Sequence, residues 1–212
     1  MGNSSVYNVQ EANNGSSLYT TYINLAHRTD RKKEIEDELH RIGLHEFQRF
    51  NAIKHKKGAM GCFLSHFAAL QQGIDSGKDH IIILEDDFQM LVSPVELHEL
   101  LQTLTHVDYD VFLMSPTYYS KSCVKKTSHH LLLKNTKSDN TGGYIVNKKY
   151  AATLLKHYEI GIKLLQLYPV YNFHVDVFAN ILKKRDRWFC YHKPFGKQRD
   201  GFSDIDQTNK TF

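Results

Sequence analysis

The chain has 212 residues, of which 41% are hydrophobic, 24% charged and 12% aromatic. This composition excludes an intrinsically disordered chain and supplies enough apolar side chains for one core. The net charge of +4 arises from 27 basic and 23 acidic residues, an excess too small to indicate nucleic acid as the main partner.

The first segment, residues 1–17, is rich in Asn, Ser and Gly and is expected to be a flexible leader. It lacks the apolar stretch of a signal peptide, and apolar runs elsewhere are too short to span a bilayer. Cys62, Cys123 and Cys190 are widely spaced and show no CxxC and no metal-type pairing with histidine. We therefore expect reduced thiols in a cytoplasmic protein without an integral membrane segment, with one domain over residues 18–212.

Strand and helix patterns alternate after the leader. Apolar and β-branched runs predict strands at 18–25, 46–53, 80–84, 109–114 and 143–146. Apolar residues at helical spacing predict helices at 31–42, 60–73, 94–104, 150–157 and 175–182. The continuously apolar run at 80–84 is typical of a strand covered on both faces of a parallel sheet. The alternation predicts an α/β sandwich of the nucleotide-binding kind, with a mostly parallel central sheet flanked by helices.

Three carboxylates, Glu85, Asp86 and Asp87, follow the 80–84 strand directly. They lie at the carboxyl edge of the expected sheet, where open α/β folds place their ligands. On an extended backbone Glu85 and Asp87 point to one side, so these two could share a cation such as Mg²⁺ or Mn²⁺. The alternative is that the triplet only caps the next segment or solvates the strand end.

Six short segments stand in an order and at spacings that occur together in one enzyme family. They are YINL at 22–25 followed by Arg28, Asp30 and Arg31, GCFLSH at 61–66, ILEDD at 83–87, TGGYIV at 141–146, VD at 175–176 and SDI at 203–205. Together they resemble glycosyltransferase family 25, the lipooligosaccharide and procollagen galactosyltransferase group. The resemblance runs over residues 20–206.

The resemblance implies a GT-A type fold, a UDP-sugar donor, inversion at the anomeric carbon, and a cation (Mn²⁺ or Mg²⁺) held by a DxD-like motif. That motif maps to residues 85–87, with Glu85 and Asp87 as the implied metal ligands. Glutamate at the first position keeps the oxygen donors and lengthens their reach.

The resemblance also implies a set of residues that contact the donor. They are Asn24, Arg28, Arg31, Ser65, Glu85, Asp86, Thr141, Gly142, Gly143, Arg199, Ser203 and Asp204. The Arg28 loop could instead be a surface turn, and the small residues at 141–143 an ordinary tight turn. Arg199, Ser203 and Asp204 belong to a tail that is expected to fold over the donor, as lids do in many transferases.

An inverting transfer is a direct displacement without a covalent enzyme intermediate, so it needs a group that removes the proton of the acceptor hydroxyl. The resemblance points to Asp176, whose alternative role is a plain helix N-cap. His66 is the second catalytic candidate, although a histidine on an apolar helix is more often a satisfied core residue than a catalyst. Basic residues late in the chain could attract the diphosphate; they are Lys183, Lys184, Arg185 and Arg187.

The predicted function is metal-dependent, inverting transfer of galactose or glucose from a UDP-sugar to a hydroxyl of a glycan or a hydroxylysine-type protein acceptor. Two rivals remain: a nucleotide-sugar binding module without turnover, and a metal-dependent phosphohydrolase. The phosphohydrolase would need further ligands at recurring spacing, and the 13 histidines form no HExxH arrangement. The sequence names neither the sugar nor the acceptor.

Overall fold

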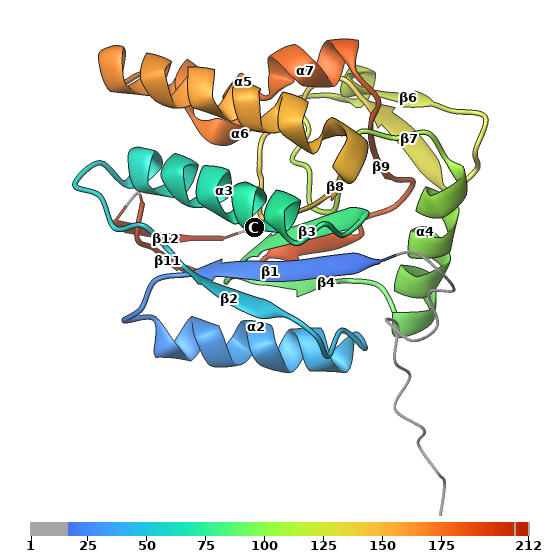
Figure 1. The fold of residues 1–212 in the computed structure, drawn as a ribbon, viewed down its shortest axis with the longest axis horizontal. Helices are drawn as coiled ribbons and strands as arrows, with labels where there is room; N and C mark the ends of the chain where they lie inside the picture. The colour runs from blue at the N-terminus through green and yellow to red at the C-terminus, as the bar shows by residue number, and fades with distance from the viewer. Residues whose placement is uncertain (1–16, 206, 212) are drawn as a thin grey trace, which may run out of the picture.

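The computed structural model describes residues 17–205 and 207–211, so the predicted leader lies outside the described residues except for Ser17. Helices flank an eight-stranded sheet whose strand order is β2-β1-β3-β8-β5-β9-β7-β6 (Figure 1). The strands of this sheet are β1 Leu18–Asn24, β2 Gln48–Asn51, β3 His80–Glu85, β5 Val111–Leu113, β6 Val124–Lys126, β7 Leu132–Asn135, β8 Gly143–Asn147 and β9 Trp188–Tyr191. The α-helices are α2 Thr29–Arg41, α3 Gly58–Asp75, α4 Pro94–His106, α5 Lys148–Leu167, α6 Val175–Phe178 and α7 Asn180–Arg185.

Short elements complete the described chain. Two small sheets pair β4 with β10 and β11 with β12, each in antiparallel fashion. Their bounds are β4 Phe88–Met90, β10 Gly196–Gln198, β11 Gly201–Ser203 and β12 Thr208–Lys210, and the 3₁₀ turns are η1 Lys121–Cys123 and η2 Tyr171–Phe173.

The strand directions confirm the predicted fold class. β1 runs parallel to β2 and β3, and β5 runs parallel to β9. β8 is antiparallel to β3 and β5, and β7 is antiparallel to β9 and β6. Six strands (β2, β1, β3, β5, β9, β6) therefore point one way and two (β8, β7) the other, so the sheet is mostly parallel.

The central strand β3 is covered on both faces, as its continuous apolar run predicts. Ile81 and Ile83 belong to the core under α3, α5, α6 and α7, whereas Ile82 and Leu84 belong to the core shared with α2 and α4. All four side chains are fully buried. Burial on both sides fixes the direction of β3 and hence the place where its polar end emerges.

Each predicted helix and strand exists, with differences at the ends. α5 continues to Leu167, beyond the predicted end at 157, and the predicted helix 175–182 is two short helices, α6 and α7, joined at Ala179. β9 was not predicted, because periodicity alone does not distinguish a strand from a buried helix segment in an apolar run as short as its four residues WFCY. Within the described residues, no helix combines the length and the apolar character needed to cross a bilayer.

Candidate active site

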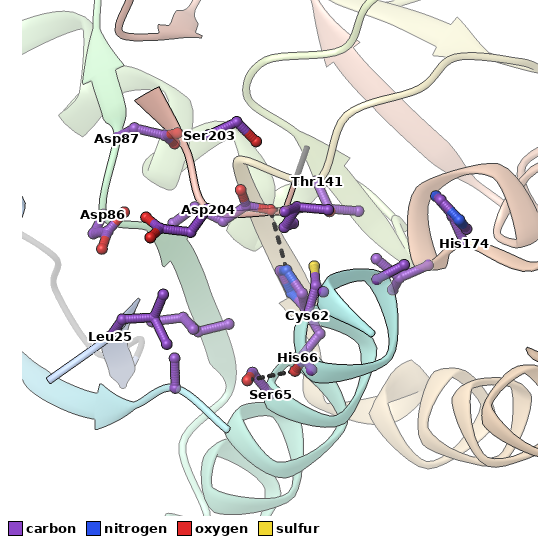
Figure 2. A pocket seen from close by; sticks show the side chains of 18 of the residues that line it. Leu25, Cys62, Ser65, His66, Asp86, Asp87, Thr141, His174, Ser203 and Asp204 are labelled. Carbon is purple, nitrogen blue, oxygen red and sulfur yellow. Dashed lines mark hydrogen bonds and ion pairs between the residues drawn. The ribbon is translucent and has the colours of Figure 1, made fainter. Parts of the chain in front are cut away.

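A pocket of about 970 Å³ opens at the carboxyl ends of β1 and β3. Its wall comes from the segment before α3, the acidic turn after β3, the loop before β8, the start of α6 and the β11–β12 hairpin. Figure 2 shows Asp86 and Asp87 at one end of this pocket, Cys62, His66 and Thr141 near its middle and His174 at the other end. The sheet edge predicted to hold the ligand is thus the edge that bears the pocket.

Glu85 is held in the pocket wall by three side chains. His66 Nε2 and Thr141 Oγ1 each lie 3.2 Å from Glu85 Oε1. Gln198 Nε2 lies 3.3 Å from Glu85 Oε2 and 3.4 Å from Asp87 Oδ1. Because one amide contacts both carboxylates, an oxygen of Glu85 and an oxygen of Asp87 face a common point.

The backbone that carries the triplet is not extended throughout, contrary to the expectation. β3 ends at Glu85, and Asp86 and Asp87 form a turn into β4. Asp86 accepts a 2.7 Å hydrogen bond from Asn24 Nδ2. Arg31 Nη1 bridges the two aspartates, at 3.1 Å from Asp86 Oδ1 and 3.0 Å from Asp87 Oδ2. All three carboxylates line the pocket, although their partners differ.

The turn is anchored by Phe88, which follows Asp87 and is fully buried. A Cβ atom on Gly143 would lie 2.7 Å from the Phe88 ring, and one on Gly196 would also clash with that ring. The absence of a side chain at Gly143 therefore leaves room for the Phe88 ring, and Gly143 does not line the pocket. Gly142 is likewise enclosed, since a Cβ there would lie 2.9 Å from Asn140 Oδ1.

The carboxylates titrate unequally. Burial, reinforced by the charge of Glu85, raises the pKa of Asp87 to about 7 despite the opposing charge of Arg31. Burial also raises the pKa of Asp86. For Glu85 burial acts in the same direction, but the hydrogen bond and charge of His66 outweigh it and lower the pKa. Asp87 thus holds its proton more tightly than an ordinary aspartate, as expected where negative charge is crowded.

The donor set fits a hard divalent cation. Glu85 and Asp87 offer carboxylate oxygens that already share one hydrogen-bond donor, Gln198. Oxygen ligands of this type are those that Mg²⁺ and Mn²⁺ prefer. The pKa of Asp87 is raised first by burial and then by the charge of Glu85, and a cation there would oppose both effects by favouring the ionised carboxylate.

Asp176 lies in the same pocket, on α6, and is half-buried. Its Oδ2 accepts a 3.0 Å hydrogen bond from Asn140 N, and its Oδ1 accepts one of 2.9 Å from Val177 N. The N-cap of α6 is His174, so Asp176 is not the plain helix cap that was its alternative. The carboxylate is oriented by backbone amides while it remains part of the pocket wall.

The basic residues at 183–187 do not line the pocket, so their predicted attraction for a diphosphate does not fit the structure. Lys183 is fully buried, and its Nζ donates to Ser138 O at 2.7 Å and to Asp176 O at 3.1 Å. Burial lowers the pKa of Lys183 to about 8. Lys183 therefore binds the backbone of the pocket wall at Asp176 from the interior of the protein.

Other basic residues do line the pocket, and the sequence interpretation missed most of them. Besides His66 they are His27, Arg31, Lys54, His55, Lys56, His174 and Lys210. Only Arg31 was assigned to the donor from the sequence. The stretch at 54–57 resembles ordinary solvated surface, and its place at the pocket is set by the packing of α3.

The tail folds against the N-terminal loop, so Ser203 and Asp204 line the pocket. Arg28 Nη1 lies 2.6 Å from Asp204 Oδ2, and Arg31 Nη2 donates to Phe202 O at 2.9 Å. Asn24 and Arg28 do not line the pocket, because their side chains hold Asp86 and the tail.

Three residues predicted to act in the site have other roles: two hold neighbouring residues in place, and one lies outside the pocket wall. Ser65 Oγ accepts from Ile53 N at 2.8 Å and donates to Gly61 O at 2.7 Å. His66 is buried and places Glu85. Arg199 is absent from the pocket wall and lies beside Glu38, 3.5 Å away.

The far end of the pocket carries one aromatic ring, that of Tyr171. Tyr171, Thr117 and Asp139 line it, and Tyr171 is 55% exposed. Asp139 accepts hydrogen bonds from the hydroxyls of Tyr119 and Tyr171, the latter at 2.6 Å. These residues were not predicted, since they come from irregular segments without a motif.

One cluster contradicts the sequence interpretation of the cysteines. Cys62 and His66 stand one helical turn apart on α3, and their ligand atoms lie within 4.8 Å of one another and of a Glu85 oxygen. The C-x₃-H spacing on a helix was the signal that could have indicated this pairing.

Comparisons with known proteins concern the family and the fold of the chain. A sequence model described as glycosyltransferase family 25 (LPS biosynthesis protein) matches residues 56–170, more than half of the chain. A solved glycosyltransferase involved in the glycosylation of the major capsid of PBCV-1 is similar in structure, with a TM-score of 0.57, 11% identity, and coverage of 90% of this chain and 96% of that one. A197 from STIV is similar with a TM-score of 0.51, 11% identity, and coverage of 91% and 92%. At such identities the likeness concerns the fold alone. Among curated proteins, no sequence matches significantly.

Proposed function

Since the chain belongs to glycosyltransferase family 25, we propose that it transfers a hexose, galactose or glucose, from a UDP-sugar to a hydroxyl of a glycan or hydroxylated protein, with inversion and with a divalent cation. That it is a glycosyltransferase follows from the family. The donor, the cation, the stereochemistry and the residue roles constitute the proposal.

The observation that carries the proposal is the presence of two kinds of acidic group in one pocket. Glu85 and Asp87 form a pair that fits a cation, and Asp176 lies apart from them with amides orienting both of its oxygens. An inverting transfer needs one group that holds the cation at the departing diphosphate and another that removes the proton of the acceptor hydroxyl. When bound, the cation supplies Lewis-acid stabilisation of the departing diphosphate.

Asp176 acts as the general base in this proposal. Its two backbone hydrogen bonds restrain the carboxylate without occupying all of its lone pairs. A carboxylate restrained in this way can accept the proton of an acceptor hydroxyl placed between it and the donor sugar.

Cationic side chains stand beside the six carboxylates of the pocket wall. Arg31 lies against Asp86 and Asp87, and Lys54, Lys56 and Lys210 line the same pocket. Cationic side chains around a pocket favour an anionic ligand such as a nucleoside diphosphate. Asn24 contributes indirectly, because it holds Asp86.

The aromatic end suits the acceptor. Tyr171 presents an exposed ring, and its hydroxyl is fixed by Asp139. An aromatic face provides apolar contact, while the neighbouring Asp139 and Thr117 provide hydrogen-bonding groups, a combination that suits a sugar.

Thermal unfolding with UDP alone, Mn²⁺ alone and both together tests the proposal. At about a hundredfold excess over the dissociation constant, a native-state ligand contributes roughly 2.7 kcal/mol, which in a domain of this size raises Tm by about 5 to 10 °C. We expect this rise only with both ligands, and turnover when UDP-hexoses are then screened with glycan acceptors.

Asp87→Asn should lose the joint shift, because the variant lacks one carboxylate of the cation pair. Asp37→Asn is the matched control, since Asp37 pairs with Lys33 on the exposed side of α2. No shift with any nucleotide and metal would contradict the proposal. A joint shift without turnover of any UDP-hexose would indicate a binding module.

A further inference from the structure

A second group of metal-binding atoms adjoins the acidic turn and differs from it in chemistry. Cys62 and His66 project from successive turns of α3, and Glu85 lies opposite at the end of β3. A thiol sulfur, a ring nitrogen and a carboxylate oxygen of these residues all lie within 4.8 Å of one another. All three residues line the pocket, so a metal held there would keep an open coordination position.

We propose that Cys62, His66 and Glu85 bind a thiophilic divalent cation, Zn²⁺, and that this cation inhibits transfer by weakening the neighbouring hard-cation site, which shares Glu85. Thiolate and imidazole ligands favour Zn²⁺, whereas Mg²⁺ and Mn²⁺ prefer oxygen. The inhibitory part rests on the proposed function, and the binding part does not.

The distances are close to those of a tetrahedral zinc site. His66 Nε2 and Glu85 Oε1 are 3.2 Å apart. With zinc-to-ligand bonds of roughly 2.0 to 2.1 Å, two such ligands stand about 3.3 Å apart. The nitrogen and oxygen therefore need little movement, and the remaining adjustment is the approach of the Cys62 sulfur by rotation of its side chain.

The ligands are oriented by neighbours behind them. The Tyr144 hydroxyl lies 3.0 Å from His66 Nδ1, and Thr141 Oγ1 donates to Glu85. A hydroxyl accepts as well as donates, so Tyr144 can stabilise the tautomer of His66 that leaves Nε2 free for a metal. Hydrogen bonds of this kind to the second nitrogen of a histidine ligand tune metal affinity.

Glu85 is shared by the two cation sites. Its Oε1 faces His66, and its Oε2 lies with Asp87 Oδ1 against the Gln198 amide. Zn²⁺ bound at Oε1 would draw on the negative charge that the hard cation also uses and would repel that cation at short range. Zinc should therefore weaken Mn²⁺ binding without contacting the nucleotide.

Metal binding by the metal-free whole chain tests the site without any assay of transfer. We expect Co²⁺ to give a sulfur-to-metal charge-transfer absorption, and Zn²⁺, titrated against a chromophoric chelator, to bind in one equivalent. Cys62→Ser should remove that absorption and weaken Zn²⁺ binding at least about tenfold. Cys62→Ala provides a second variant if serine disturbs this partly buried position.

Cys123→Ser is the matched control, because Cys123 lies on η1 and does not line the pocket. A wild-type protein without the charge-transfer band, or equal zinc affinity in wild type and both Cys62 variants, overturns the site.

The inhibitory part is measured separately, as the zinc concentration that halves the rate of transfer. It should rise at least about tenfold in Cys62→Ser, in proportion to the lost affinity, and an unchanged value overturns the inhibition. Zinc binding that depends on Cys62, in a protein that turns over no UDP-hexose, supports the site and contradicts the proposed function.

Discussion

Asp176 is the residue on which the proposed chemistry depends most directly. Replacing it with asparagine keeps the size of the side chain and the oxygen that accepts from Asn140 N, and gives up only the bond from Val177 N, which the amide NH₂ cannot accept. Loss of a general base lowers kcat by roughly 10² to 10⁴. We expect a fall in this range for Asp176→Asn, measured with a UDP-hexose and acceptor, while UDP and Mn²⁺ still raise Tm.

Glu159→Gln is the matched control for this prediction, because Glu159 pairs with Lys163 on the exposed side of α5. If Asp176→Asn kept most of its activity, another group would be the base. If the variant lost the ligand-induced rise in Tm, Asp176 would belong to the donor site.

The sequence predicts the kinds of site residue better than their roles. Glu85, Asp86 and Asp87 are placed at the sheet edge because the apolar run before them can only be an inner strand. Asn24 was assigned to the nucleotide, yet it is 1% exposed and holds Asp86. That contact joins residues 62 positions apart. No local sequence pattern shows whether a polar side chain such as that of Asn24 contacts a ligand or another residue of the protein.

At the level of elements, the β11–β12 hairpin closes one wall of the pocket through few contacts. Its main ties to the N-terminal loop are the ion pair of Arg28 with Asp204 and the bond from Arg31 to Phe202 O. A partly buried pair of this kind contributes about 1 kcal/mol, or roughly fivefold in the equilibrium for local opening. The hairpin should therefore open more often when the pair is removed.

We expect Arg28→Ala to raise hydrogen exchange in residues 201–205 about fivefold and to raise the KM for the donor by a similar factor. UDP with Mn²⁺ should slow that exchange in the wild type. Lys33→Ala is the control, because Lys33 is an exposed α2 residue paired with Asp37. Equal exchange in both variants would mean that the hairpin is held by its other contacts.

Local pattern predicts the long elements because their periodicity is complete within the element. α3 and β3 are of this kind. The short strands β4 and β10 pair where Phe88 packs against Gly143 and Gly196, so this small sheet joins three segments far apart in the chain. Contacts of such separation are invisible to periodicity, which is why the small sheets around the pocket were not predicted.

On the scale of the whole molecule, Lys183 connects segments that lie far apart in the sequence. Its ammonium group binds carbonyls of the loop before β8 and of α6, and lies 5.7 Å from the centroid of the Trp188 ring on β9. The group is buried, and its pKa is lowered to about 8 by that burial. Folding is therefore linked to the protonation of one lysine.

The direction of this linkage follows from the two pKa values. Between about 8 in the folded state and 10.5 in the unfolded state, the unfolded chain holds the extra proton. The free energy of unfolding must then rise with pH in this window, by at most about 3 kcal/mol, and Lys183 contributes no slope below it. Lys183→Met should lack this rise, although it leaves two carbonyls unpaired and starts from a lower stability.

Urea unfolding from pH 7 to about 9.5, below the range in which ordinary tyrosines titrate, measures the difference between wild type and variant. Lys184→Met is the control, since Lys184 is the exposed neighbour and should keep the wild-type slope. Lys183→Arg is a second variant, because guanidinium does not deprotonate in this range and should also abolish the rise. A slope that persists in both Lys183 variants would mean that Lys183 stays charged in the folded protein, with the loop before β8 and α6 stabilised by an ammonium group at all pH values measured.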